Sequence, residues 1–436
     1  MADLATHQSG ALPQANIDDL AVLSGRLGDS GALARARAEA LHSYRRMTLP
    51  DRVQHLWRYT DPARLLPDPV ILSASLRGKL PPPLAVVPEI PTHGASGLIQ
   101  TGTVETLLLS PEMREAGVQL RPLGSEPGAL DLLGGAVPAT HGPFAALNAA
   151  TWSAGAVLRI PRGVRLDRPI HLALPAAAAI SIPRVLVVVE PGAEATVVEE
   201  HLGGEPGHRV NGVSELFIGQ GARLSHVLLQ RWAAGVSGHL TQRAVVHRDG
   251  RIDTLVTSFG GATMKADIGS ELVGEGAHSE ILGLAVGEGR QHLDHHTVHA
   301  HRARHTTSNL DLRVAVAGRA NSAYTGLIRI DERASGCEAY QQNRNLLLSG
   351  RAQAKSIPEL EILNHDVSCS HGATVAPMDE EPLFYLQSRG VNRDEAMRIA
   401  VRGFLDPVLQ QVPHGLREDV TRTLENRIAA LERGKR

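Results

Sequence analysis

Hydrophobic positions change their period along the chain. The first hundred residues indicate helices and loops, with an Ala/Arg/Leu-rich run at 18–46 and a proline-rich break at 81–83 that is typical of a linker. From about Gly155 short β-branched runs alternate and end at glycine turns, as in RVLVVVEPGAEATVVEE at 184–200. This alternation predicts strands for the middle of the chain.

The glycine turns of this middle region recur. Four of them are spaced 29 residues apart, at Gly163, Gly192, Gly221 and Gly250. Gly276, Gly318 and Gly350 continue the series less regularly, and Ala or Arg follows each glycine from Gly192 on. A repeat of 20 to 50 residues built from strands and turns is typical of a β-solenoid. A β-sandwich ranks second, because sandwich strands vary in length and would rarely keep one interval.

Helical spacing returns near the C-terminus. Asp379 can cap a helix that runs through Arg389 and stops at Gly390, and Asn392 with Glu395 resembles a capping box for the next helix. A last helix has an apolar stripe made of Leu416, Val420, Leu424, Ile428 and Leu431. This helical group could cap the end coil of a solenoid or offer an apolar face to another protein. We therefore expect three domains: helical or loop at 1–95, β-solenoid at 96–374 and helical at 375–436.

The composition argues against several classes of function. With 44 basic and 46 acidic residues, the chain has no excess of positive charge that would favour binding to nucleic acid or an anionic membrane, and its 3% aromatics offer few rings for stacking on bases. It has no phosphate-binding P-loop, so we expect any ATP hydrolysis in a partner. The N-terminus lacks a signal-peptide pattern, and the longest apolar runs, such as 185–189, are far short of the ~20 residues of a membrane span. We expect a cytoplasmic protein.

Cys369 and His371 lie in the stretch DVSCSHGAT at 366–374, and the chain has 2 cysteines in all. In an extended segment these two side chains point to the same face. A thiol and an imidazole suit zinc, iron or an iron-sulfur cluster, but such sites normally take four ligands and the chain contains no CxxC. A buried structural cysteine and a Cys–His nucleophilic dyad are the alternatives. For the dyad, Asp366 would face the opposite side of the strand.

A second concentration of polar residues is the run QHLDHHTVHAHRARH at 291–305. Four of its histidines are separated by even numbers of residues: His295, His299, His301 and His305. On one strand their imidazoles would line one face. A metal site is one interpretation, but Arg302 and Arg304 favour histidines on a solvated sheet surface.

Residues 343–391, which include NHDVSCSHGATVAPMDEEPLFYLQSRGV, closely resemble the C-terminal signature of the SufB/SufD family of iron-sulfur cluster assembly proteins. HGPFAALNAA at 141–150, the run at 183–200 and the pattern Asp294-x-x-Thr297-x-x-x-His301 are similar to the family too, as is, more loosely, WRYTDP at 57–62. Within the family the form CSHGAT, followed by an acidic triplet, resembles SufD, whereas SufB typically reads His-Glu-Ala there without the cysteine.

The resemblance implies a right-handed parallel β-helix between two helical domains, and it implies a non-catalytic scaffold. SufD pairs with SufB through the ends of their β-helices, and each C-terminal domain docks one SufC ATPase. Cys369 and His371 would then lie near the SufB interface and assist iron entry or cluster formation, with a transient iron or cluster and no tightly bound cofactor. The ATPase-docking residues expected from the resemblance are Asp379, Glu380, Leu383, Phe384, Tyr385 and Arg389.

The sequence departs from the family pattern at three places. Asn364, His365 and Asp366 stand where an acidic pair is common, Cys337 stands where a different residue is expected, and Pro377 follows the motif where a glycine is expected. Four alternatives stay open: a SufB-like subunit that holds the cluster, a solenoid polysaccharide lyase or hydrolase, an adaptor with an inert Cys369, and a homodimer in the absence of SufB. The metal identity and the participation of a reduced flavin are also open.

Overall fold

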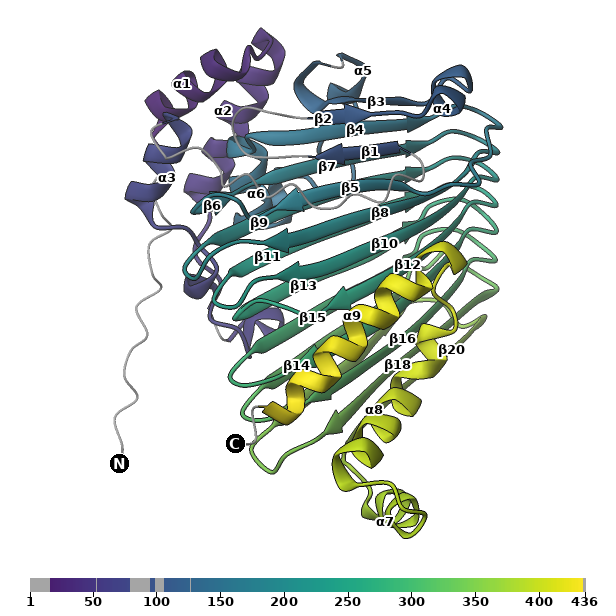
Figure 1. Ribbon diagram of the computed structural model, residues 1–436. Coiled ribbons are helices and arrows are strands. Elements are labelled where there is room, and N and C mark those ends of the chain that lie inside the picture. Colours follow the sequence, from purple (N-terminus) through teal and green to yellow (C-terminus); the bar gives the residue numbers. More distant parts are fainter. Residues whose placement is uncertain (1–15, 52, 79–94, 99–105, 126, 434–436) are drawn as a thin grey trace, which may run out of the picture.

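Two long sheets lie face to face in a computed structural model of the protein, with helices from both ends of the chain on their outer sides (Figure 1). The structure describes residues 16–51, 53–78, 95–98, 106–125 and 127–433. The expected linker at 81–83 lies outside these residues.

The strands alternate between the two sheets. Sheet A has the order β2 (Thr106–Leu108), β1 (Ala95–Leu98), β5 (Ile170–Pro175), β8 (Glu194–Gly203), β10 (Arg223–Trp232), β12 (Arg251–Ser258), β14 (His278–Gly287), β16 (Thr307–Val316), β18 (Cys337–Leu347) and β20 (Val367–Pro377). Sheet B has the order β19 (Gln353–Ile362), β17 (Asn321–Ile330), β15 (His292–His301), β13 (Thr263–Leu272), β11 (Ser237–Val246), β9 (Arg209–Ile218), β7 (Pro183–Val189), β4 (Ala154–Ile160) and β3 (Gln119–Pro122), with β6 (Ile180–Ser181) beside β9. From β4 on, strand pairs are parallel. The chain forms a parallel β-solenoid of about 8 turns, which confirms the predicted fold.

The turns form two columns, one along each edge of the sheets. In the column that leads from sheet B to sheet A, the left-handed conformation falls on Gly163, Gly192, Gly221, Asp249, Gly276, His305 and Gly336. The predicted series describes this column, except that Asp249 has the positive φ of 52° and not Gly250. Gly318 and Gly350 lie in the other column, between β16 and β17 and between β18 and β19. The predicted series was irregular after Gly250 because it mixed turns from both columns.

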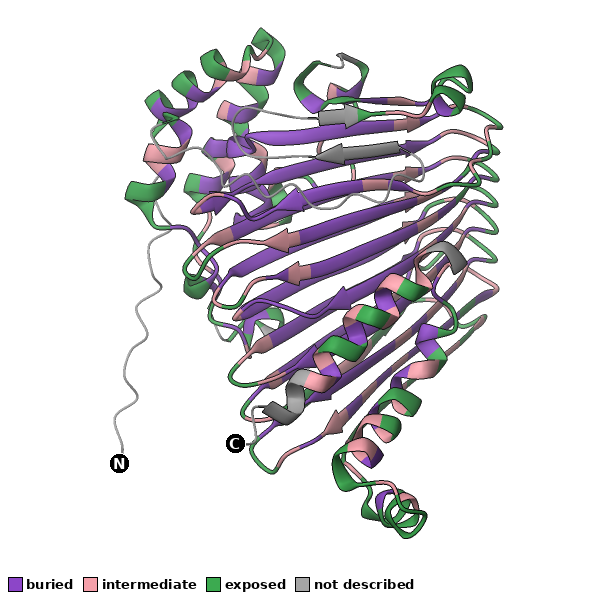
Figure 2. Cartoon of the chain, viewed as in Figure 1, coloured by how far each residue is buried: buried purple, intermediate pink, exposed green. Residues whose placement is uncertain are grey.

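The space between the sheets changes character along the solenoid. In the first coils it holds mainly aliphatic side chains, including Ala195, Val197, Leu216 and Ile218, and one buried polar group in which Glu199 is hydrogen-bonded to His201 and Ser214. The later coils bury further polar side chains: His295, His299, His301, Gln341, Asn343 and Asn345. Most strand residues in the middle of the sheets are buried (Figure 2).

The N-terminal helices pack on the outer face of sheet B. They are α1 (Ile17–Leu27), α2 (Gly31–Arg46), α3 (Pro69–Leu76) and α6 (Pro143–Thr151), with the short α5 (Pro127–Leu130), η1 (His55–Trp57), η2 (Pro62–Arg64), η3 (Leu123–Ser125) and η4 (Ala139–His141). The short α4 (Pro111–Glu115) instead places Met113 in the core cluster between the sheets, with Leu158 and Leu172. Leu33 and Leu147 share a core cluster with Leu186 of β7. The run at 18–46 forms two helices, because Gly28 ends α1 in the left-handed conformation and the Ser30 side chain caps α2.

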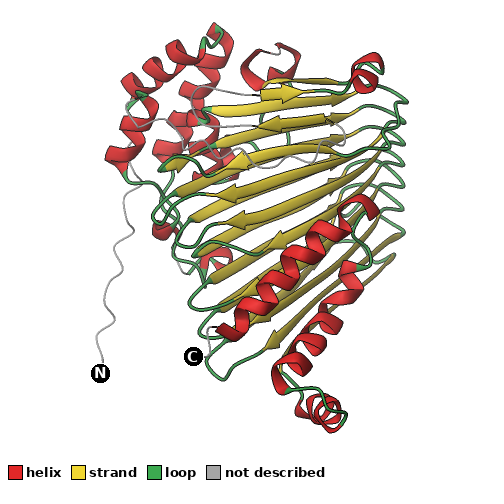
Figure 3. Cartoon of the chain, viewed as in Figure 1, coloured by secondary structure: helices red, strands yellow, loops and turns green. Residues whose placement is uncertain are grey.

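The C-terminal helices are α7 (Glu380–Ser388), α8 (Arg393–Leu409) and α9 (His414–Arg433) (Figure 3). Both predicted N-caps are confirmed: Asp379 accepts from the Glu381 N–H at 3.0 Å, and Asn392 accepts from the Glu395 N–H at 2.9 Å. The capping box is only half formed, because the Glu395 side chain pairs with Arg398.

Helices α8 and α9 lie across the outer face of sheet A (Figure 1). From the predicted stripe, Val420, Leu424 and Ile428 are buried in a cluster with Leu255 of β12 and Leu282 of β14. The idea that this helical group caps the end coil is therefore wrong: it covers the side of the solenoid. Among the described residues, no helix combines the length and the hydropathy needed to cross a membrane.

Candidate functional site

The last coil of the solenoid is open. Strands β19 and β20 end the two sheets, and no residue within either strand is fully buried. Four large apolar side chains in and beside these strands are exposed: Leu360, Ile362, Leu363 and Val375. An edge strand also offers unpaired backbone N–H and C=O groups. Within the described part of the chain, this end is the one large strand edge that no helix covers (Figure 1).

Cys369 and His371 lie on one face of β20. In the parallel register Cys369 is beside Ala339 of β18, and His371 is beside Gln341, which is buried. Neighbouring residues of parallel strands point to the same side, so both side chains face the inside of the solenoid at its open end. Cys369 is half-buried against the cluster of Ala339 and Cys337, and His371 is exposed.

The environment of Cys369 favours the protonated thiol. Burial, followed by the neighbouring Cys337, raises the pKa of Cys369 above its ordinary value. A nucleophilic Cys–His dyad needs a lowered thiol pKa, so this geometry gives it no support. A metal ion could still bind, because a metal displaces the thiol proton when it coordinates sulfur.

Cys337 lies inside the penultimate coil. Its side chain is 1% exposed, and its Sγ is 3.1 Å from Thr306 Oγ1 and donates to the Ala334 carbonyl oxygen at 3.3 Å. Thr306 Oγ1 lies 2.8 Å from His301 Nδ1. These contacts satisfy the Cys337 thiol within the core, and in the register it is beside Val367, two residues from Cys369.

Polar side chains of β18 support the last coil. Asn345 Nδ2 donates to the Thr374 carbonyl oxygen of β20 at 3.3 Å, and Gln341 Nε2 donates to the Glu359 carbonyl oxygen of β19 at 3.4 Å. The sequence reasoning missed these residues. Their alternation in QQNRN at 341–345 was the available signal, since it places three amides on one face of a strand.

The structure corrects the interpretation of the histidine run. His295, His299 and His301 of β15 are buried between the sheets, and His305 lies in the following turn. His295 Nε2 is 2.8 Å from Ser258 Oγ, and His301 Nε2 is 2.9 Å from Ser308 Oγ. A solvated surface was the wrong expectation, because Arg302 and Arg304 belong to the turn and say nothing about the face of the strand. Among the described residues, no three ligand atoms of this run lie within 4.8 Å of one another.

The residues in and beside α7 that were expected to dock the ATPase are of two kinds, those that hold the helix in place and those that are exposed. Asp379 caps the helix, and the Glu380 carboxylate accepts two hydrogen bonds from Arg393 of α8, at 2.7 and 2.8 Å. Leu383 differs from the expectation: it is fully buried, so it anchors α7 and presents no surface to a partner.

The exposed part of α7 is aromatic. Phe384 is 73% exposed and Tyr385 is 58% exposed. The Arg389 guanidinium lies 5.3 Å from the centre of the Tyr385 ring. This patch, Phe384, Tyr385 and Arg389, combines apolar area with a positive charge, as protein interfaces often do.

Residues 172–404 match the family model described as "SUF system FeS cluster assembly, SufBD core domain". This match covers more than half of the chain. The chain belongs to the SufB/SufD family. It is 28% identical over 283 residues to an iron-sulfur cluster assembly SufBD family protein of Staphylococcus epidermidis and, equally, to the iron-sulfur cluster assembly protein SufB of Bacillus subtilis. Each alignment covers 64% of this chain and 60% of the relative, so the chain matches less than two thirds of the relatives' length.

SufB/SufD membership agrees with the solenoid, and the matched residues include β20, α7 and most of α8. The family places the chain among iron-sulfur cluster assembly proteins and not among solenoid polysaccharide lyases. The family model does not distinguish SufB from SufD.

Proposed function

We propose that this protein is a SufD-like, non-catalytic subunit of a cytoplasmic SufBCD complex, in which it assists iron entry or cluster formation. The observation that carries the proposal is the open last coil, whose inner face presents Cys369 and His371. The CSHGAT form of the motif, with its cysteine, supports the SufD-like role.

The open coil is suited to a SufB-like paralogue. Exposed Leu363 and Val375 and the free backbone groups of β20 gain most from a partner that continues the stack of strands. Cys369 and His371 supply two ligand atoms, whereas zinc and cluster sites commonly use four. A partner that ends in the same kind of coil would supply the remaining ligands to the iron or cluster, which is cargo of the complex. A homodimer through the same end is the alternative in the absence of the paralogue.

The Phe384/Tyr385/Arg389 patch is our proposed docking surface for the SufC-like ATPase. The Glu380–Arg393 pair and buried Leu383 fix α7 on α8, so the aromatic side chains are presented by a supported helix. We expect Phe384→Asp to reduce recovery of the ATPase with the complex at least tenfold, because a charge in a desolvated interface costs several kcal/mol. Co-purification of the three subunits measures this. Ile399→Asp on α8, which is also an exposed apolar position, is the matched control. Equal losses in both variants would contradict a docking surface centred on Phe384.

The test of the proposed function is His371→Ala, co-expressed with the SufB and SufC partners. We expect the complex to form in normal yield while iron and acid-labile sulfide per complex fall several-fold, because His371 is exposed at the open end and supports no core contact. The control is His365→Ala, another exposed histidine that lies just before β20. Unchanged iron in the His371 variant would leave the chain as an adaptor with an inert motif.

The second candidate is a SufB-like subunit that holds the cluster itself, and the similarity to Bacillus subtilis SufB favours it. Anaerobic reconstitution of the chain alone with iron and sulfide separates the two. A SufD-like subunit is expected to retain little cluster, because it contributes only part of the ligand set.

A further inference from the structure

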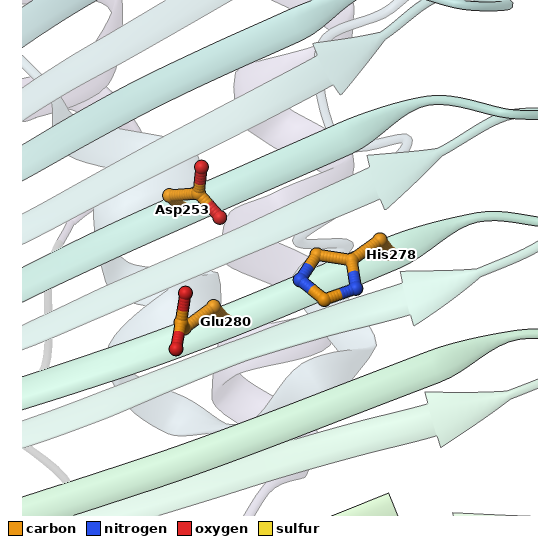
Figure 4. Close-up of side chains that lie close together, drawn as sticks. All are labelled: Asp253, His278 and Glu280. Atoms are coloured by element: carbon orange, nitrogen blue, oxygen red, sulfur yellow. The ribbon is translucent and has the colours of Figure 1, made fainter. Parts of the chain in front are cut away.

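The outer face of sheet A contains a cluster of metal-binding side chains that the proposed function does not use. Asp253 lies on β12, and His278 and Glu280 lie on β14 (Figure 4). In the parallel register Asp253 is directly beside Glu280. One ligand atom from each of the three residues lies within 4.8 Å of the other two. Strands β16 and β18 separate β14 from β20, and Cys369 and His371 face the inside of the solenoid.

The imidazole of His278 is oriented by a neighbouring strand. Its Nδ1 is 2.6 Å from Thr307 Oγ1 on β16. Its Nε2 is a buried atom without a hydrogen-bond partner among the described residues. Histidines that bind metals usually donate the second ring N–H to an oxygen, which leaves the other nitrogen's lone pair for the metal. If Nδ1–H donates to Thr307, the lone pair of Nε2 is free in this way. Burial, and then Arg251, lowers the pKa of His278, whereas the carboxylates of Asp253 and Glu280 act in the opposite direction.

The carboxylates of Asp253 and Glu280 are held by hydrogen bonds and ion pairs from the neighbouring residues Asn309 and Arg251. Glu280 accepts a hydrogen bond from Asn309 Nδ2 at 3.1 Å. Arg251 Nε donates to Asp253 Oδ2 at 2.8 Å, and its Nη2 lies 2.8 Å from Asp253 Oδ1 and 3.5 Å from Glu280 Oε2. The two carboxylates and the guanidinium together carry one net negative charge. The Arg251 side chain is 39% exposed, so it can leave the cluster for solvent.

We propose that Asp253, His278 and Glu280 bind a divalent cation such as Zn²⁺ or Fe²⁺ in competition with the guanidinium of Arg251. One imidazole nitrogen and two carboxylate oxygens match the ligands of these borderline cations, whereas Mg²⁺ and Ca²⁺ prefer oxygen ligands alone. Three protein ligands leave further positions for water. The rival interpretation is a simple ion-pair network, in which Arg251 is the permanent counter-ion and the histidine is a bystander.

The experiment measures Zn²⁺ affinity by competition with a chromophoric chelator. It uses the untagged full chain with Cys369→Ser and His371→Ala, so that the candidate site at the open coil does not contribute. We expect this parent to bind Zn²⁺ and His278→Ala to weaken binding at least tenfold. Arg251→Gln removes the competing cation and is expected to tighten binding several-fold. His42→Ala, an exposed histidine of α2, is the control and leaves the affinity unchanged.

Glu280→Gln is the second ligand variant, because it keeps the shape of the side chain if His278→Ala disturbs folding. Thermal unfolding of each variant verifies the fold. Weaker binding in both ligand variants supports the site, and parental affinity in both overturns it. Arg251→Gln with parental affinity would overturn the competition by Arg251. Because the parent lacks Cys369 and His371, failure of this proposal leaves the proposed function untouched.

Discussion

Arg184→Met is expected to lower the free energy of unfolding by about 3–5 kcal/mol, because it leaves a buried carboxylate without its counter-ion. Arg184 is 1% exposed and Glu215 is fully buried. Arg184 Nη2 is 2.6 Å from Glu215 Oε1, and Arg184 Nη1 donates to Asn148 Oδ1 of α6 at 3.0 Å. The guanidinium therefore joins β7, β9 and α6, and methionine replaces its volume but none of these bonds.

Equilibrium unfolding in urea measures the effect. The matched control is Arg159→Met, which breaks a pair with Glu190 whose side chains are 25% and 32% exposed, and it is expected to cost less than about 1 kcal/mol. Adding Glu215→Gln to the Arg184 variant removes the unpaired charge and should recover part of the loss. A loss below about 1 kcal/mol for Arg184→Met would show that backbone N–H groups at 134–137, which also bind Glu215, are sufficient to hold the charge.

The free energy of unfolding is expected to fall steeply as the pH drops from about 6.5, the ordinary histidine pKa of an unfolded chain, toward 4. Burial lowers the pKa of His171, His295 and His301 to about 4 and that of His239 and His299 to about 3. In this window the unfolded state binds more protons than the folded state. The contribution of these histidines to the free energy of unfolding is therefore fully present above about pH 6.5 and is lost on acidification.

The size of the acid effect follows from the number of such groups. At pH 5 each histidine is expected to cost about 2 kcal/mol, and all five about 10 kcal/mol, which approaches the whole stability of a typical domain. Asp267 and Asp294, whose pKa values lie below the ordinary range, add a further loss below about pH 4. Urea unfolding at a series of pH values measures the curve.

His239→Phe isolates one of these groups. The His239 ring stacks on Phe144 at 4.5 Å and on Trp57 at 5.7 Å, so phenylalanine can keep the stack while the titrating nitrogen is removed. Between pH 6 and 4 the slope of unfolding free energy against pH is expected to decrease by up to about 1.4 kcal/mol per pH unit. His42→Gln on the surface of α2 is the control and keeps the original slope. An unchanged slope in His239→Phe would contradict the buried neutral imidazole.

Local patterns in the sequence were sufficient to predict the repeat, the helix caps and the shared face of Cys369 and His371. The turn at Gly192 repeats at Gly221 because each coil reuses the same local geometry, and Asp379 caps α7 through the adjacent N–H of Glu381. Parity along β20 needs only the alternation of a strand. The placement of the two residues at the open coil, however, came from the resemblance to the SufB/SufD family.

Only the tertiary structure decided which face of each strand is inside and which residues of different coils meet. The alternation of side chains along a strand predicted that His295 and His299 share one face. Only the packing of β15 against sheet A showed that this face lies inside the solenoid. Arg251 lies beside His278, and the next coil brings Thr307 beside His278, because turn lengths set the register between coils. Sequence periodicity fixes the faces of one strand, whereas register and burial depend on contacts between residues far apart in the chain.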